Sequence, residues 1–383
     1  MSRWAAAIDF GTSKIAVVAG MLDERGALHV MGAGQQAYAG FRDDEWLDVE
    51  GLEDAILSAR KAAEKQAGRR IRDMFVAVPG EYIQVAFNHA EVEIRSRYGV
   101  VGRDDVEELI ARTGDFDQPD CYLPLHRTPV AYIIENQTRY KPPIGDKAQY
   151  LSGYVSHVLA ARSFVEDVGT ILSNLGIGVM GMIAGPVGSG YLVRSDNEAK
   201  RTAIVIDAGH FTTDVMVAEG EGLVFHDNLP VGGGSITRDI SLLLGMQPEE
   251  AEQLKRKLVL GMNRGEGIPM QRGGHGALAD AQEIAEARVW DMADQIAALL
   301  RDSGVSYDAQ TGIYLTGGGL GQMRGAKDIL SATLGRIVKP YSHASPLLGG
   351  PAFSTAAGTL FYALNVLQKT PVSSLIAWFR DLF

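Results

Sequence analysis

The segment "VIDAGHFTTD", residues 205–214, joins two apolar runs through an Asp-x-Gly turn. Asp207 closes the first run, Gly209 follows two residues later, and threonines lead into the second run. A single hairpin of this kind is common and indicates only a tight turn between strands. The stretch "AIDFGTSKIAVVAG", residues 7–20, has the same layout about two hundred residues earlier, a separation that suits a duplicated domain.

Strand-like runs alternate with helical patterns along most of the chain, which indicates an α/β architecture. Between residues 81 and 162 the pattern changes to long alternating runs around one short helix, which is typical of an inserted subdomain. The predicted parts are residues 1–80 and 163–198 for the first half, 81–162 for the insert, 199–365 for the second half, 366–374 for a short linker and 375–383 for an amphipathic helix.

Composition excludes several classes of function. A hydrophobic content of 46% is too high for a disordered chain, and a net charge of -11 argues against nucleic-acid binding as the main activity. Cys121 is the only cysteine, so neither an internal disulfide nor a cysteine metal site is expected. Without a signal-peptide pattern or a run of about 20 apolar residues, we expect a soluble protein or one attached to a membrane surface.

The two Asp-x-Gly turns are suited to holding phosphate. Such a turn exposes successive backbone N–H groups and hydroxyls, and the aspartate beside it can hold Mg²⁺, largely through water. Asp9 and Asp207 are therefore the predicted catalytic and metal residues. The predicted phosphate-binding residues are Gly11, Thr12, Ser13 and Lys14 in the first turn, and Gly209, His210 and Thr212 in the second.

A base-binding site is predicted from two further motifs. Gly317, Gly318 and Gly319 stand between a strand and a helix, where residues without a Cβ let the backbone approach a nucleoside closely. An ordinary strand-to-helix turn is the alternative interpretation. The second motif places Glu252, Lys255 and Arg256 on one helical face, although a solvated charged face has the same pattern.

The motifs and their order resemble the actin-like ATPase superfamily, which includes actin, heat-shock chaperone ATPases and sugar kinases. Within it the chain is most similar to the FtsA family, through "PVGGGSITRDISLLLGMQPEEAEQLKRK" (230–257), "YLTGGGLGQMRG" (314–325) and the end of the insert, "PPIGDKAQYLSGYVSHVLAARSFVEDVGTILSNLGIGV" (142–179). The resemblance implies two duplicated ribonuclease-H-like halves around a nucleotide cleft, with an FtsA-type insert. It also implies ATP and Mg²⁺ as ligands and adds Gly233 to the nucleotide-binding residues.

The resemblance also implies a location and partners. Members of this family polymerise on the cytoplasmic face of the bacterial membrane at the division site, where they tether FtsZ filaments by the FtsZ C-terminal peptide. The implied partners are therefore FtsZ, further copies of the chain, the lipid surface and other division proteins, with no nucleic acid among them.

The last residues, "KTPVSSLIAWFRDLF" (369–383), carry one apolar stripe. Pro371 breaks the preceding pattern, and a serine can cap the helix that follows. A helix docked on its own domain has the same periodicity, but the aromatic residues and the resemblance favour a membrane-surface helix. The predicted membrane residues are Leu375, Ile376, Trp378, Phe379, Leu382 and Phe383.

Three residues depart from the family pattern. His210 and Phe211 stand where related turns carry small residues, and their bulk is expected to crowd the loop that holds the terminal phosphate. The Phe211 ring could either narrow the phosphate pocket or point outward into a contact between subdomains. Gly185 stands where related chains carry an acidic residue that helps to order Mg²⁺ and the attacking water. The sequence therefore predicts ATP binding with weak or absent hydrolysis.

Two rival functions share the fold. A small-molecule kinase of the superfamily needs a general base near a substrate hydroxyl, and no further aspartate stands out for that role. A soluble pilus-assembly protein of the PilM type lacks an amphipathic end, so the stripe in 375–383 argues against it.

Overall fold

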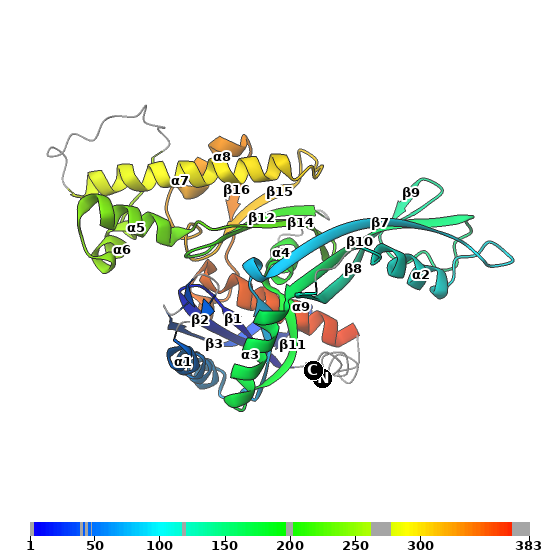
Figure 1. Ribbon diagram of the computed structural model, residues 1–383, viewed down its shortest axis with the longest axis horizontal. Helices are drawn as coiled ribbons and strands as arrows, with labels where there is room; N and C mark the ends of the chain where they lie inside the picture. Colours follow the sequence, from blue (N-terminus) through cyan, green and yellow to red (C-terminus); the bar gives the residue numbers. More distant parts are fainter. Residues whose placement is uncertain are drawn as a thin grey trace.

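The computed structural model describes residues 4–38, 41–42, 45–46, 48–116, 120–196, 202–261 and 277–369. Two α/β halves meet along a common junction, and a narrower part extends away from it (Figure 1). One hydrophobic core fills the first half and continues across the junction, a second fills the rest of the second half, and a small third lies in the extended part.

The first half is built on a five-stranded sheet. Its strands, in sheet order, are β11 (Gly178–Ala184), β6 (Asp73–Val78), β1 (Ala5–Phe10), β2 (Lys14–Leu22) and β3 (Leu28–Ala37). The first three strands of the chain form an antiparallel meander, whereas β6 and β11 run parallel to β1. Two short strands, β4 (Phe41–Arg42) and β5 (Glu45–Trp46), pair separately.

Helix α1 (Val49–Ala67) packs on β2 and β3 through its apolar stripe. It begins where the Asp48 side chain accepts a hydrogen bond from the Gly51 N–H at 2.9 Å, and it ends where Gly68 takes a φ of 63°. Both ends follow the usual capping chemistry, an acceptor at the N-terminus and a left-handed glycine at the C-terminus. Helix α3 (Arg162–Asn174) packs against β11.

The second half repeats this plan. Its strands, in sheet order, are β14 (Gly222–Leu229), β13 (Thr213–Glu219), β12 (Thr202–Ala208), β15 (Gly312–Thr316) and β16 (Val338–Pro340). Strands β12, β13 and β14 form an antiparallel meander, and β15 and β16 run parallel to β12. The two sheets thus have the same strand order and directions, which confirms the predicted duplication. The helices of this half are α5 (Gly233–Leu244), α6 (Pro248–Lys255), α7 (Ala277–Asp302) and α8 (Ala326–Leu334).

Each half ends in a helix that packs on the sheet of the other half. Helix α4 (Gly185–Asp196) follows the last strand of the first sheet and contacts β12 and β13, whereas α9 (Ser354–Lys369) contacts β1 and β2. The two helices cross closely because Gly188 and Gly358 face each other, and a Cβ on either would overlap the other backbone. This exchange of helices locks the halves together around one junction.

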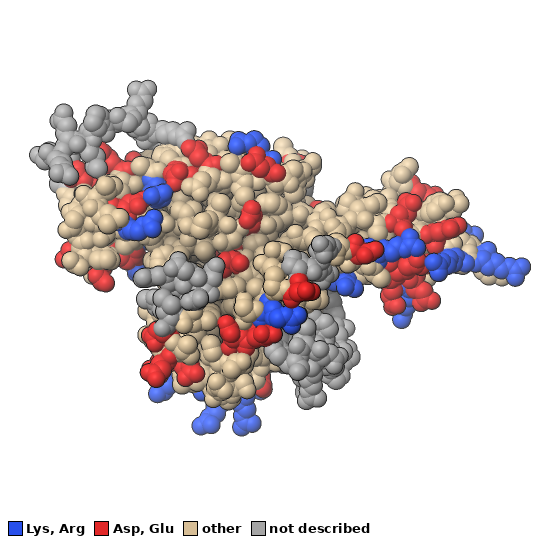
Figure 2. Space-filling model, in the orientation of Figure 1, with Lys and Arg blue, Asp and Glu red and all other residues tan. Residues whose placement is uncertain are grey.

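The insert forms a separate four-stranded sheet. Its strands, in sheet order, are β7 (Ile83–Glu93), β10 (Tyr150–Ala161), β8 (Tyr122–Ile134) and β9 (Gln137–Arg139), and α2 (Arg103–Thr113) packs on one face. Its base contacts both halves: the Leu223 N–H donates to Ser156 Oγ at 3.1 Å, and the Ala184 N–H donates to His126 Nε2 at 2.9 Å. Figure 2 shows acidic side chains over both halves and basic ones at the far tip of the insert.

The end of the second half differs from the predicted boundary. Helix α9 continues to Lys369, so the first four residues of the 366–374 segment are helical rather than linker. Good helix formers continue up to Lys369, and Pro371 disfavours helix only at the residue before it. The predicted helix at 375–383, with its six membrane residues, lies outside the described residues. Within the described part of the chain, no helix is long and apolar enough to cross a membrane.

Candidate functional site

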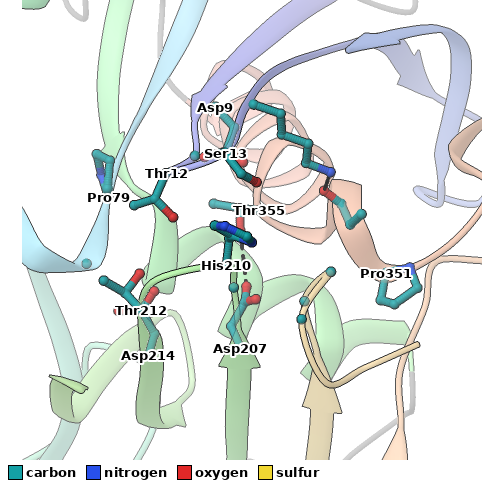
Figure 3. Close-up of a pocket in the computed structure, with 18 of the residues that line it drawn as sticks. Asp9, Thr12, Ser13, Pro79, Asp207, His210, Thr212, Asp214, Pro351 and Thr355 are labelled. Atoms are coloured by element: carbon teal, nitrogen blue, oxygen red, sulfur yellow. Dashed lines mark hydrogen bonds between the residues drawn. The ribbon is translucent and has the colours of Figure 1, made fainter. Parts of the chain in front are cut away.

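The two Asp-x-Gly turns face each other across a cleft of about 290 Å³ between the halves. Figure 3 shows Asp9 on one side of this cleft and Asp207 on the other. The cleft is lined by all but one of the residues predicted to bind nucleotide or metal: Asp9, Gly11, Thr12, Ser13, Lys14, Asp207, Gly209, His210, Thr212, Glu252, Lys255, Arg256, Gly317, Gly318 and Gly319. Gly233 is the exception, because it packs behind Gly209 and Gly319.

The two turns have the same length and the same backbone hydrogen bond. Four residues separate the last paired residues of the strands in each case, after Phe10 and after Ala208. The Gly11 N–H donates to the Lys14 carbonyl at 3.0 Å, and the Gly209 N–H donates to the Thr212 carbonyl at 2.8 Å. Superposed in this register, Thr12 corresponds to His210, Ser13 corresponds to Phe211, and Lys14 corresponds to Thr212.

The turns also contact each other. The Phe211 N–H donates to Thr12 Oγ1 at 3.2 Å. This hydrogen bond joins the second turn directly to the first.

The structure places His210 in the cleft, as expected, and decides between the two positions left open for the Phe211 ring. The His210 ring lines the cleft, but the Phe211 side chain is 47% exposed and lies outside it. Among the described residues, only Glu135 and Asn136 are non-glycine residues with positive φ, so neither bulky residue strains the turn. Burial, followed by the charge of Lys255, lowers the pKa of His210, which therefore stands in the cleft as a neutral imidazole.

Lys14 connects the first turn to the start of α9. Its Nζ donates to the Ala352 carbonyl at 2.7 Å and to Gln35 Oε1 at 3.2 Å. Burial lowers its pKa, and the charges of Asp9 and Asp207 act in the opposite direction. The Lys14 ammonium thus brings a positive charge to the cleft and is already hydrogen-bonded to Ala352 and Gln35.

Asp9 and Asp207 are poorly solvated carboxyl groups. Burial raises the pKa of Asp9 to about 6, with Lys14 lowering it and Asp214 raising it. Burial, then the charges of Asp214 and Asp9, raise the pKa of Asp207 to about 7. Hydrogen bonds to Asp207 from Thr355 at 3.1 Å and from Ser189 at 3.4 Å oppose that rise. A cation in the cleft would stabilise both ionised forms.

The residues fit a hydrated divalent cation. Five carboxyl groups, from Asp9, Glu81, Asp207, Asp214 and Glu252, line the cleft together with three cationic side chains, from Lys14, Lys255 and Arg256, so acidic groups outnumber basic ones. Within the described residues, no group of three His, Cys, Asp or Glu side chains is close enough to hold a metal directly. Oxygen donors that act through water are the arrangement that Mg²⁺ accepts readily.

Glycines allow the second turn, the start of α5 and the 317–319 turn to pack backbone against backbone. Gly317 has a φ of 89°, and the Gly319 N–H donates to the Ala208 carbonyl at 2.8 Å. A Cβ at Gly319 would overlap the Gly209 carbonyl. The structure thus shows a packing role for this glycine turn within the protein, and its approach to a nucleoside stays a prediction.

The charged face of α6 forms an internal network at the edge of the cleft. Lys255 Nζ donates to the Gly233 carbonyl at 2.9 Å and to Glu252 at 2.7 Å, while Arg256 pairs with Glu252 at 2.9 Å. Burial alone would raise the pKa of Glu252, but hydrogen bonds from Lys255 and Thr237 hold it at about 2. The ionised network fixes α6 against α5, beside the glycine turn.

Gly185 begins α4 next to Thr355. An ideal Cβ at Gly185 would lie 2.7 Å from Thr355 Cγ2, so an acidic side chain has no free path here without movement of that threonine. The Thr355 hydroxyl instead binds Asp207. Gly185 and Thr355 are thus matched to each other, and the sequence alone did not reveal their contact.

Comparison with known proteins places these features in one family. The family model described as "Cell division protein FtsA" matches residues 204–358, and the model described as "SHS2 domain inserted in FTSA" matches residues 80–159. Cell division protein FtsA of Pseudomonas aeruginosa is 28% identical over 94% of this chain and 88% of its own length. The protein of the same name from Escherichia coli K12 is 24% identical over 98% of this chain and 95% of its own length.

Solved structures share the fold. The PilM–PilN type IV pilus biogenesis complex contains a chain that matches with a TM-score of 0.62 and 16% identity, over 94% of this chain and 98% of that one. MreB5 of Spiroplasma citri, solved bound to AMPPNP, matches with a TM-score of 0.54 and 12% identity, over 96% and 98%. The predicted fold class, an actin-like fold with an FtsA-type insert, is confirmed.

Proposed function

Because this chain belongs to the FtsA family of cell division proteins, we propose that it binds ATP with Mg²⁺ in its cleft and assembles on the cytoplasmic face of the membrane. There it tethers FtsZ filaments and brings other division proteins to the division site. One observation carries the nucleotide part of the proposal. Two turns of equal length, set between strands of matching register, face each other across one cleft, and each turn carries its own hydrogen-bond donors.

Different residues of the two turns would hold different parts of the nucleotide. The turn amides and the hydroxyls of Thr12 and Ser13 would hold phosphates, and Lys14 would add positive charge. Asp9 and Asp207 would hold Mg²⁺ through water, and the ion would neutralise phosphate charge. The glycine turn at 317–319 and the charged face of α6 would border the nucleoside.

Hydrolysis in this proposal is weak. Gly185 provides no acid to order the attacking water, and Thr355 stands in the way of one. Turnover of the purified protein should stay well below about 1 per second, the lower edge of ordinary enzyme rates. Gly185→Glu with Thr355→Ser should raise turnover more than Gly185→Glu alone, because the serine removes the clashing methyl group and keeps the hydroxyl on Asp207.

Membrane attachment rests on the sequence of residues 375–383. Six large apolar residues share one face of the predicted helix, and the segment has nearly balanced charge. A lone helix of this size would bind lipid reversibly, whereas a polymer that presents many copies would bind by avidity. Trp378→Asp with Phe379→Asp should abolish co-sedimentation with liposomes while the melting temperature stays unchanged.

The FtsZ contact is proposed for the subdomain that carries α5 to α7. Near the C-terminal end of α5, Leu242 and Leu243 are 72% and 56% exposed. Adjacent exposed leucines are suited to an apolar peptide such as an FtsZ tail. Leu242→Ser with Leu243→Ser should weaken binding of that peptide without changing nucleotide affinity.

Calorimetry with Mg²⁺ and ATP tests the nucleotide part directly. Gly318→Asp places a carboxylate in the cleft, where the nearest atom to its Cβ is the Ala352 Cβ at 3.2 Å. The dissociation constant of the Gly318→Asp variant for ATP should rise at least about tenfold, which corresponds to about 1.4 kcal/mol. Ala332→Asp, at an exposed position on α8, adds the same charge outside the cleft and should bind like the parent. A parent protein that binds no nucleotide would refute the proposal.

A further inference from the structure

The cleft-facing ends of the two sheets carry different rows of side chains. In the second half, cross-strand partners form a polar row of Asn228, Asp214, Asp207 and Thr316. In the first half, the corresponding row is Gln35, Ala16, Asp9 and Ala77. Directly opposed residues of neighbouring strands point to the same face of a sheet. Asp214 therefore adds a carboxylate next to Asp207, at the position where the first half has a methyl group.

Two donors fix the Asp214 carboxylate. His226 Nε2 lies 2.9 Å from Asp214 Oδ1, and Asn228 Nδ2 donates to the same oxygen at 2.9 Å. The His226 side chain is 3% exposed and that of Asp214 is 18% exposed, so both contacts are shielded from water. Two such contacts on one oxygen hold the Asp214 carboxyl group in one orientation.

The backbone of the first half leaves room for this carboxylate. Gly80 begins the 3₁₀ turn η1 (Gly80–Tyr82), and a Cβ at that position would overlap Asp214 Oδ1. Figure 3 shows Asp214 beside Thr212, on the same side of the cleft as Asp207 and across from Asp9. Asp214 also contributes to the raised pKa values of both other aspartates, which places its charge within reach of each.

We propose that His226 and Asn228 are positioning residues for the cation that accompanies the nucleotide, because they hold Asp214 as a third carboxylate toward the hydration shell of Mg²⁺. This inference rests on the proposed nucleotide site. The Asp214 carboxylate compensates in part for the acid that Gly185 does not supply. The two donors themselves do not contact the cation, and their effect is exerted entirely through Asp214.

Nucleotide affinity measured with Mg²⁺ and with EDTA separates this role from a structural one. His226→Leu should reduce the gain in ADP affinity that Mg²⁺ confers by about tenfold, the usual cost of losing an outer-shell partner of a metal site. The affinity in EDTA should change less than about twofold. His226→Gln, whose amide can donate to Asp214, should restore most of the gain, and Asn228→Ala should resemble His226→Leu.

His157→Leu is the matched control, because His157 is 3% exposed and its Nε2 lies 3.0 Å from Thr113 Oγ1 in the insert. It should leave the Mg²⁺ dependence unchanged. An equal loss of affinity in Mg²⁺ and in EDTA, or the same loss in His157→Leu, would refute the positioning role.

Electron paramagnetic resonance of Mn²⁺ gives a readout that needs no nucleotide turnover. The parent should bind Mn²⁺ more tightly than His226→Leu, and His226→Gln should lie between them. If the parent binds Mn²⁺ but no nucleotide, the proposed function fails while the positioning role survives. Equal Mn²⁺ binding by the parent and by His226→Leu would reject the positioning role alone.

Discussion

The two turns of the cleft have one backbone and two kinds of chemistry. They share length, hydrogen bond and strand register, yet the first carries Thr12, Ser13 and Lys14 where the second carries His210, Phe211 and Thr212. The first turn thus supplies small donors and a cation. The second half supplies the supported carboxylates of its polar row. Duplication fixed the geometry, and side chains on each copy then diverged without disturbing it.

The glycines that follow β6 in the first half and β15 in the second extend the comparison. Gly319 follows β15 as Gly80 follows β6, but their neighbours differ: Gly319 abuts the Gly209 carbonyl, whereas Gly80 abuts the Asp214 side chain. Backbone cannot move aside as a side chain can. We therefore expect Gly319→Ala to have the largest effect, a loss of about 3 kcal/mol or more in the free energy of unfolding.

Chemical denaturation measures that loss, with Gly318→Ala as the neighbouring control. The nearest atom to a Cβ at Gly318 is another side-chain carbon at 3.2 Å, so its cost should be clearly smaller. Equal stability of both variants would mean that the contact between Gly319 and the Gly209 carbonyl tolerates a methyl group as well as the neighbouring Gly318 position does.

Gly80→Ala should cost about 1–3 kcal/mol, because the new methyl group overlaps Asp214 Oδ1. Asp214→Ala removes the overlapping atoms, so the double variant should be more stable than the sum of the two single losses. A coupling of at least about 1 kcal/mol in a double-mutant cycle is expected for residues in contact. Strict additivity would show that the first half does not pack on this carboxylate.

Much of this molecule could be predicted from its sequence. The duplicated turns and the glycine turn are local signals that spacing and residue type express. The rest depends on contacts that no local pattern encodes. Thr355 reaches Asp207 across 148 residues, and the bonds from His226 and Asn228 to Asp214 depend on strand register. Asp214 stands in the segment quoted first, but no role in the cation site was predicted for it.

The pH dependence of cation binding follows from the raised pKa values of about 6 for Asp9 and about 7 for Asp207. Mg²⁺ needs both groups ionised, so affinity for Mg²⁺ with ADP should rise about tenfold or more between about pH 5.5 and about pH 8. In EDTA the rise should be much smaller. Calorimetry at both pH values measures this affinity. An affinity that does not change with pH would contradict the raised pKa values of the two carboxyl groups.

Asp9 and Asp207 also make the free energy of unfolding depend on pH, but in the opposite direction to the Mg²⁺ affinity. The folded carboxyl groups keep protons that the unfolded chain, with an ordinary pKa of 3.8, has already released. Without metal, these two groups therefore favour the folded state at low pH. Their contribution to the free energy of unfolding should fall as pH rises from about 4 through about 7.

Exchanging the turn residues tests whether the second turn can be made like the first. His210→Thr introduces the residue that corresponds to it, Thr12, and removes a neutral ring from the wall of the cleft. A wider cleft with an added hydroxyl should bind ATP about threefold to fivefold more tightly, which corresponds to about 0.7–1 kcal/mol. Weaker binding would show that the imidazole contacts the nucleotide.

Phe211→Ser completes the exchange and should have the smallest effect. The ring is 47% exposed and lies outside the cleft, while the Phe211 N–H that contacts Thr12 belongs to the backbone and survives the substitution. ATP affinity should therefore change less than about twofold, and the free energy of unfolding by about 0.5 kcal/mol. Removal of the ring contact with His210, whose centroid lies 4.4 Å away, accounts for that small loss. A gain in ATP affinity as large as that of His210→Thr would mean that the phenylalanine ring enters the cleft when nucleotide binds. In that case bulk at both positions limits the second turn. If the effect stays small, His210 rather than Phe211 is the bulky residue that limits phosphate binding by the second turn.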